Sequence, residues 1–386
     1  MMSIKLALRN LLGAGLRTWL NVIVLSFSYV IIIWYQGLID GWNIQARRDL
    51  VAWEIARGQF WHEAYDPYDP FTLEDSHATI PAELASEDAV PILITQGTIY
   101  PEGRIQGVAL KGIPEDQQVL RLPTEKLIKE DGEIPVLIGS RMAKNNKLKE
   151  GDFLTLRWRD TNGTFDATEV KIAGIFKTDV ASVDKGIIWL SLHDLQHMTQ
   201  SENEATMIVT GSESLTGTEI PGWDFKSPDF LLTDLNQIIK QKTIGGSIMY
   251  ILLLLLALLA IFDTQILSIF RRQKEIGTFI ALGMTRKQVV KLFTLEGGMN
   301  SVLAALVAAV YGIPLLIIQN NVGWAMPYNT DDLGIAISEV IYPSYSLGLI
   351  LGTILAVIIT ATIVSYLPAR KIAKMNPTDA IKGKIQ

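Results

Sequence analysis

Four long apolar segments constrain the fold of this chain more than any other feature. Each has about 18 or more mostly apolar residues, the length that an α-helix needs to cross the hydrocarbon core of a bilayer. They lie at about residues 19–38, 248–269, 299–318 and 345–367. With 49% hydrophobic and only 19% charged residues, the chain is too apolar for an ordinary soluble protein of its 386 residues. The sequence therefore predicts an α-helical membrane protein with four transmembrane helices.

The first apolar segment follows basic residues, as the apolar part of a signal peptide does. Its apolar core of about 20 residues exceeds the roughly 7–15 residues of a signal peptide, and no small-residue cleavage site follows it. We therefore expect an uncleaved membrane anchor.

The basic residues near the segments predict their orientation, because Lys and Arg in short loops prefer the cytoplasm. They gather after the second segment and after the fourth: Arg271, Arg272, Lys274, Arg286, Lys287 and Lys291, then Arg370, Lys371, Lys374, Lys382 and Lys384. Residues 319–344 contain neither Lys nor Arg. Both termini are thus predicted in the cytoplasm. Residues 41–242 are predicted outside, since long domains translocate regardless of charge.

The external block has the pattern of an α+β domain inserted between helices 1 and 2. Runs of β-branched and aromatic residues alternate with Gly, Pro, Asn and Asp, which is typical of strands and turns. Asn162-Gly163 marks a hairpin. Residues 140–148 and 191–198 look helical, and a polar, Pro-punctuated stretch at 112–135 suggests a join between two subdomains.

These patterns divide the chain into eight parts. The first is an amphipathic helix with the first span (1–40), and the second is the extracytoplasmic domain (41–242). The second span (243–270), a cytoplasmic loop (271–296) and the third span (297–318) follow. The last three are an external loop (319–344), the fourth span (345–367) and a cytoplasmic tail (368–386).

Composition excludes several functions. A net charge of −6 argues against nucleic acid as a partner. The absence of cysteine excludes disulfides, thiolate metal sites and a cysteine nucleophile. His193 and His197 are spaced as metal ligands on a helix would be, but HDLQH lacks the glutamate of a zinc-protease motif. We therefore predict two solvated histidines, no metal site and no catalytic residue.

The segment QFWHEAYDPYDPF, residues 59–71, interleaves aromatic and acidic residues. It is open to two interpretations. One is an apolar contact surface for a lipid or apolar ligand, and the other is a surface loop with local packing.

The cytoplasmic loop encodes a short amphipathic helix, a turn and a new helix. Ile276, Phe279 and Ile280 recur at helical spacing, and Gly283 stands where a helix C-terminal glycine belongs. Thr285 and Gln288 then form a T-x-x-Q capping box. A helix lying in the headgroups would explain the basic charge. The small residues favour a docking surface for another protein, because they let it approach closely.

Two intramembrane features stand out. Asp263 lies within the second segment, where a charge indicates either a functional group or one that bonds inside the bundle. Small residues recur every four positions in the third and fourth segments, which favours close helix packing, either within one chain or across a dimer. They are Ala304, Ala308 and Gly312, then Gly348 and Gly352. Neither of these two segments offers a polar lining for a water-filled conduit.

Several segments resemble the FtsX/MacB-like ABC transporter permease superfamily. LALRNLLGAGLRTWLNVIVLSF resembles its first span, and RRQKEIGTFIALGMTRKQVVKLFTLEG resembles its loop between spans two and three, although Ile280 replaces the usual basic residue. YLPARKIAKMNPTDAIKG resembles its C-terminal signature. VLIGSRMAKNNKLKEGDFLTLRW and VKIAGIFKTDVASVDKGIIWLSLHDLQHM resemble the external domain of lipoprotein-releasing (LolC/LolE-type) permease subunits.

The resemblance implies that the basic loop is a coupling helix, which fits a groove on a cytosolic ABC ATPase dimer. The residues carried over to this role are Arg271, Arg272, Glu275, Ile276, Gly277, Ala281, Leu282, Gly283 and Thr285. No phosphate-binding loop occurs in the sequence, so ATP and Mg are expected on that partner and no cofactor on this chain. The chain itself is thus not expected to be an enzyme.

The resemblance also implies a setting and a substrate class. The setting is the bacterial inner membrane, with the large domain in the periplasm. The further partners are a second permease chain, identical or related, and a periplasmic carrier or adaptor. Lipoprotein extraction from the outer leaflet is the first expectation. Export of peptides, antibiotics or toxins and regulation of a cell-wall hydrolase are the alternatives. Residues 42–51 and 229–239 are expected to continue as helices that link the domain to the membrane.

Overall fold

The computed structural model describes residues 16–129, 132–215, 218–325 and 340–371. The expected amphipathic helix before residue 16, most of the external loop and most of the cytoplasmic tail lie outside these residues. The described chain forms two compact units, a helical unit and a sheet unit. The sheet unit covers residues 43–238.

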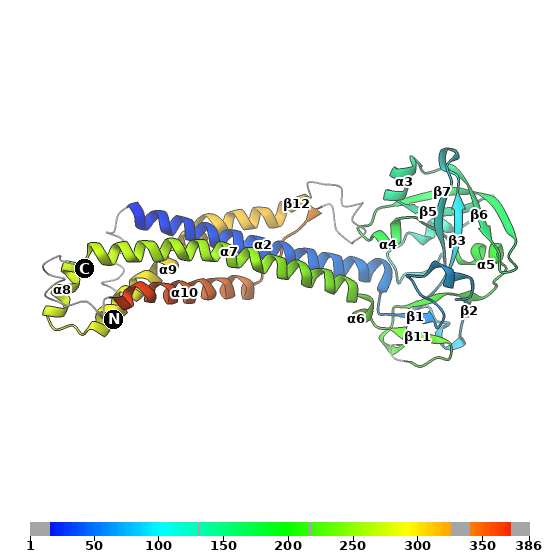
Figure 1. The fold of residues 1–386 in the computed structure, drawn as a ribbon. Coiled ribbons are helices and arrows are strands. Elements are labelled where there is room, and N and C mark those ends of the chain that lie inside the picture. The colour runs from blue at the N-terminus through cyan, green and yellow to red at the C-terminus, as the bar shows by residue number, and fades with distance from the viewer. Residues whose placement is uncertain (1–15, 130–131, 216–217, 326–339, 372–386) are drawn as a thin grey trace. The chain divides into compact units, whose positions relative to one another are not determined.

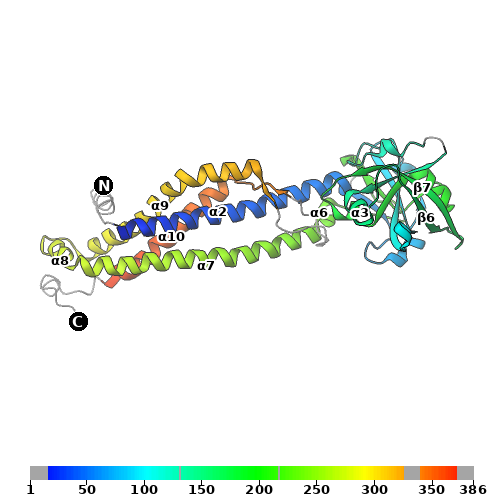
Figure 2. The same cartoon turned by 90° about the horizontal axis from the view of Figure 1, so that it is seen from above.

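Within the described residues, four helices are long and apolar enough to cross a membrane, as the sequence predicts. They are α2 (Leu16–Leu50), α7 (Thr233–Arg271), α9 (Arg286–Val322) and α10 (Leu347–Ala369). In the helical unit they lie alongside one another, as Figures 1 and 2 show from two directions. Because α9 is continuous, the second half of the predicted cytoplasmic loop and the third span share one helix.

The core of the helical unit consists of small and branched apolar residues from all four helices. Leu25 and Tyr29 of α2 form one buried cluster with residues that include Leu258 of α7, Ala308 of α9 and Val357 of α10. The outward faces are apolar as well. Phe27 is 60% exposed and Leu256 is 66% exposed. An apolar core inside an apolar surface is expected of a bundle whose solvent is lipid.

Two of these helices continue beyond the helical unit. The division between the units falls after Trp42 in α2 and before Ile239 in α7. The continuations expected at residues 42–51 and 229–239 are present. A π-helical turn (Val51–Ile55) follows α2, and α6 (Pro228–Leu231) precedes α7.

A nine-stranded sheet forms the second unit, in the order β11-β1-β10-β3-β4-β8-β5-β7-β6. β3 also pairs with β6, so the six strands from β3 to β6 close into a barrel. Pairs β4–β8 and β5–β7 are parallel and the others are antiparallel. The barrel strands are β3 (Ala89–Ile99), β4 (Gln106–Ile113), β5 (Ile134–Gly139), β6 (Phe153–Arg159), β7 (Phe165–Phe176) and β8 (Ile187–Ser191).

The remaining strands extend the sheet from one half of β3. Ala89 to Ile92 pair with β10, whereas Leu93 to Ile99 pair with β4. Residues 112–135, where the sequence suggested a join, run from the end of β4 to the start of β5, and both strands belong to this sheet. The additional strands are β1 (Gln59–His62), β10 (Met207–Thr210) and β11 (Trp223–Lys226), with β2 (Ala78–Thr79) and β9 (Glu204–Ala205) in a small separate sheet.

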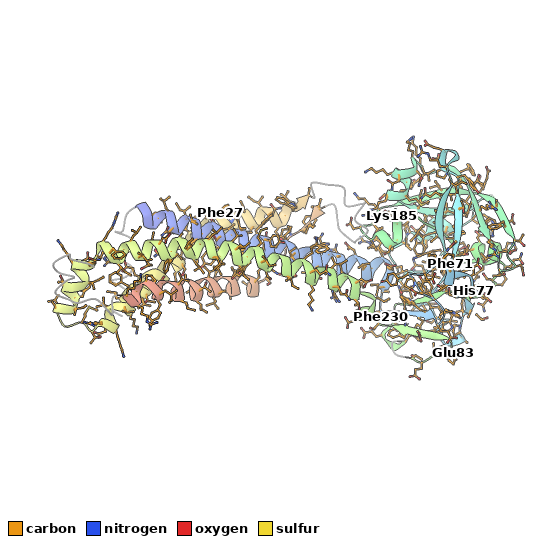
Figure 3. All side chains as sticks on the ribbon, viewed as in Figure 1. Phe27, Phe71, His77, Glu83, Lys185 and Phe230 are labelled. Carbon is orange, nitrogen blue, oxygen red and sulfur yellow. The ribbon has the colours of Figure 1, made fainter. Side chains whose placement is uncertain are left out.

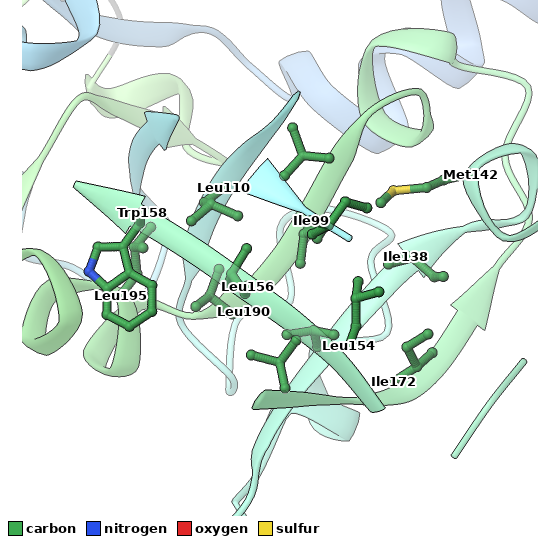
Figure 4. Close-up of a cluster of buried hydrophobic side chains, with 14 of the residues drawn as sticks. Ile99, Leu110, Ile138, Met142, Leu154, Leu156, Trp158, Ile172, Leu190 and Leu195 are labelled. Atoms are coloured by element: carbon green, nitrogen blue, oxygen red, sulfur yellow. The ribbon is translucent and has the colours of Figure 1, made fainter. Parts of the chain in front are cut away.

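Alternating side chains fill the barrel. Residues of β6 alternate between exposed and buried, which places Leu154, Leu156 and Trp158 inside. They meet Ile138 and Leu190 from other strands, as Figure 4 shows. The β6–β7 hairpin turns at Asn162-Gly163, where Gly163 has φ +83°, as predicted.

Short helices connect the strands. They are α3 (Ser140–Asn146), α4 (Ala181–Asp184) and α5 (Leu192–Thr199), and two of them were expected from the sequence. The Trp158 indole Nε1–H donates to the carbonyl of Met198 at 2.7 Å, which ties the end of α5 to the barrel.

A buried ion pair fixes the turn from β5 into α3. Arg141 Nη1 lies 3.2 Å from Asp184 Oδ2, and the backbone N–H groups of Arg141 and Met142 donate to the same carboxylate. Burial raises the pKa of Asp184, against the lowering effect of these donors and of the arginine charge. Only glycine fits at position 139, because a Cβ there would lie 1.8 Å from Asp184 Oδ1.

Candidate functional site

The cytoplasmic loop folds into the short helix α8 (Gln273–Ala281), directly after α7. Its apolar face is buried through Ile276, which is fully inaccessible. Ile276 belongs to one buried apolar cluster with Ile269 of α7, Phe293 of α9 and Ala369 of α10. The helix is therefore held against the ends of three long helices.

A tight turn separates α8 from α9. Gly283 has φ +97°, a left-handed conformation that favours glycine. Gln288 N–H donates to Thr285 Oγ1 at 3.3 Å, and Thr285 N–H donates to Gln288 Oε1 at 2.8 Å. The predicted capping box is thus confirmed, and it starts α9 at Arg286.

Arg272 belongs to an ion-pair network inside the chain. Its Nη1 lies 2.7 and 2.9 Å from the two carboxylate oxygens of Glu296, and its Nε donates to Glu275 Oε2 at 2.7 Å. The guanidinium also lies 4.9 Å from the ring centre of Phe293. The network joins α8 to α9. Glu296 was missed by the sequence reasoning, although a glutamate just before the third apolar segment is a usable signal.

The residues assigned to coupling therefore have two different placements. Arg272, Ile276 and Gly277 face inward and hold α8 in place. The others are exposed on α8, at its ends or in the following turn: Arg271, Glu275, Ala281, Leu282, Gly283 and Thr285. Leu282 is 79% exposed, flanked by the small residues Ala281 and Gly283. We call this exposed set, together with Lys274, the α8 surface.

Asp263 lies on the outer face of α7. It is exposed, with Leu259 and Leu267 one turn away on either side, also exposed. It thus does not point into the bundle core formed by the described helices.

The two stripes of small residues have different surroundings. In α9, Ala304 and Ala308 are buried, and a Cβ at Gly312 would lie 2.7 Å from Val30 Cγ2, so this stripe packs against α2. In α10, Gly348 and Gly352 are exposed. They line a cavity between α2, α7 and α10.

In the sheet unit, the described residues contain no group of three or more potential metal ligands. His193 and His197 are both exposed on α5, as expected.

The aromatic residues of the segment at residues 59–71 divide into packed and exposed ones. Trp61 packs edge-on against Tyr65 and Phe230. Tyr68 and Phe71 are 79% and 88% exposed, and Figure 3 labels Phe71 and Phe230.

Residues 247–377 match the family model described as FtsX-like permease C-terminal. The lipoprotein-releasing system transmembrane protein LolC of Neisseria meningitidis is 22% identical over 337 residues, which cover 76% of this chain and 77% of LolC.

The macrolide export ATP-binding/permease proteins MacB are also similar. The protein from Neisseria meningitidis is 20% identical over 76% of this chain, and that from Wolinella succinogenes is 24% identical over 51%. The aligned part spans less than half of each MacB protein, 46% and 27% respectively. Residues 247–377 are therefore an FtsX-like permease domain, and the chain is homologous to the LolC and MacB ABC transporter permeases.

Proposed function

We propose that this chain is the membrane subunit of an ATP-driven transporter whose ATPase is a separate cytosolic chain. The α8 surface is the observation that carries this proposal. A highly exposed leucine between two small residues, with basic residues nearby, suits insertion into a groove of another protein. ATP and Mg would be bound by that partner.

The contacts of α8 support mechanical coupling. α8 follows α7 directly and is joined to α9 by Ile276 and by the Arg272–Glu296 pair. A displacement of α8 would therefore move both long helices. α7 has 39 residues, so at 1.5 Å per residue it is about 58 Å long, enough to reach from one side of a bilayer beyond the other. We propose that it moves the external domain.

The proposed setting is the inner membrane, with both termini in the cytoplasm and the sheet unit in the periplasm. A second permease chain is proposed against the outer face of α7. A charged side chain exposed to lipid is costly, and Asp263 lies on that face between two exposed leucines. A neighbouring chain would shield it.

The proposed substrate is a lipoprotein, extracted from the outer leaflet toward a periplasmic carrier. The LolC alignment supports this choice, because it covers about three quarters of both chains. Export of a peptide, antibiotic or toxin is the second candidate. It is supported by the MacB alignments, which cover as much of this chain but less of the relative.

Leu282→Glu tests ATPase docking. The variant places a charge at the centre of the α8 surface, and the ATPase activity that copurifies with the tagged chain from its own host should fall at least tenfold. Phe165→Glu is the matched control, because it makes the same type of change at a 61% exposed residue of the sheet unit. Undiminished ATPase activity with Leu282→Glu would contradict the docking site.

Depletion of the chain in its host tests the substrate. Lipoproteins should then accumulate in the inner-membrane fraction. Normal lipoprotein sorting together with increased sensitivity to a peptide antibiotic would replace the first candidate by the second.

A further inference from the structure

A cavity of about 700 Å³ lies within the helical unit, between α2, α7 and α10. This volume is typical of small-molecule sites, which span roughly 300–1,000 Å³. Its lining extends along α10 from Ser346 to Ala356, a rise of about 15 Å at 1.5 Å per residue. The cavity is thus long enough to take an extended alkyl chain.

Two glycines keep the α10 side of the cavity open. A Cβ at Gly352 would meet nothing within 4 Å, and one at Gly348 would meet only Ser346 Oγ, at 3.9 Å. Side chains at these positions would project into free space. In the single chain, these two glycines of the stripe therefore border free space on the cavity side.

The opposite wall has the chemistry of a cation site. Three aromatic residues, Trp34, Tyr35 and Tyr250, line the cavity together with Asp40, the one charged residue among its described lining. Among the described residues, the neutral amide of Gln36 donates to Asp40 at 3.5 Å, a long contact. Aromatic faces and a carboxylate are the groups that recognise ammonium ions. An anionic head group would be repelled.

We propose that this cavity binds a cationic amphiphile. The apolar chain lies along Gly348 and Gly352, and the ammonium group lies between Asp40 and the aromatic rings. The site is distinct from the α8 surface, and binding there requires neither ATP nor the ATPase. The inference therefore stands apart from the proposed function.

Fluorescence quenching tests the site directly, because Trp34 is part of its lining. The full chain is placed in nanodiscs and titrated with dodecyltrimethylammonium brominated on its chain. Two probes with the same brominated chain carry a sulfate or a maltoside head group. We expect saturable quenching by the ammonium probe, with an affinity at least tenfold above that for either other probe. Trp34→Phe, which removes the reporter, defines the background.

Three variants separate charge from shape. Asp40→Asn retains the size of the side chain and should lower the affinity for the ammonium probe at least tenfold, while the maltoside probe is unaffected. Gly352→Leu fills the cavity and should abolish saturable quenching by all three probes. Gly245→Leu is the matched control. A Cβ at that helical glycine also meets nothing within 4 Å, but the residue does not line the cavity, so binding should persist.

The opposite results would overturn the proposal. Equal affinities for the three head groups, or an unchanged ammonium affinity in Asp40→Asn, would show a groove that any lipid chain fills. Thermal unfolding of each variant checks that it folds. If Gly352→Leu does not fold, the comparison of Asp40→Asn with the parent chain still decides the question.

Discussion

The Arg272–Glu296 pair yields the sharpest prediction about the helical unit. Glu296 is 9% exposed and Arg272 is 19% exposed in its side chain, so each charge depends on the other. Arg272→Met leaves a buried carboxylate without its cation, which costs about 3–5 kcal/mol in comparable buried pairs. Glu296→Leu should cost less, because Arg272 retains Glu275. The double variant should recover most of the loss, since apolar residues of similar volume replace buried pairs at little cost.

The absence of native cysteine provides a clean assay. Ile276→Cys, introduced into all four backgrounds, puts a thiol at a fully buried position of α8. A maleimide reaches this thiol only when α8 opens, so the labelling rate reports the free energy of opening. At a tenfold change per 1.4 kcal/mol, a loss of about 3 kcal/mol raises the rate about 100-fold in Arg272→Met.

The order of the labelling rates is the critical result. We expect Arg272→Met to label fastest and the double variant to label more slowly than Arg272→Met alone. If Arg272→Met labels within threefold of the parent, or if the double variant labels fastest, the network does not hold α8 against α9.

Three other changes give further predictions. Gly283→Val forces a β-branched residue into a left-handed turn, at more than about 1 kcal/mol, and should reduce the copurifying ATPase activity while the chain still inserts into membranes. Gly139→Ala displaces Asp184 and should lower the midpoint of thermal unfolding by several degrees. Gly107→Ala is the control, because a Cβ there meets nothing within 4 Å, and it should leave this midpoint unchanged. Burial lowers the pKa of Lys111 below its ordinary 10.5, so the unfolded state binds the proton more tightly. Charged Lys111 therefore destabilises the folded state. This destabilisation is fully present below the pKa that Lys111 has in the folded state, and it disappears as the pH rises to about 10.5. Lys111→Met should therefore stabilise the domain at pH 7 and reduce its gain in stability toward pH 10, measured by thermal unfolding.

Local patterns in the sequence predicted the local structure well. The capping box at Thr285 and the turn at Gly283 depend on neighbouring residues, and both are present. The four long helices follow from their apolar length. The hairpin at Asn162-Gly163 follows from the rarity of residues that tolerate positive φ.

Long-range pairings were not predictable in this way. Glu296 pairs with Arg272 across 24 positions, and no local pattern announces this contact. Closure of the barrel depends on β3 meeting β6 through Gly97 and Trp158, far apart in the chain. Spacing alone also could not distinguish the α9 stripe, which packs against Val30, from the α10 stripe, which lines a cavity.

In the proposed mechanism, the α8 surface and the sheet unit lie on opposite sides of the membrane. Single cysteines at Leu282 and Phe165, both exposed, report this when spheroplasts are treated with a membrane-impermeant maleimide. We expect Phe165→Cys to be labelled in intact spheroplasts and Leu282→Cys only after the membrane is permeabilised. Labelling of both positions from the same side would contradict this mechanism.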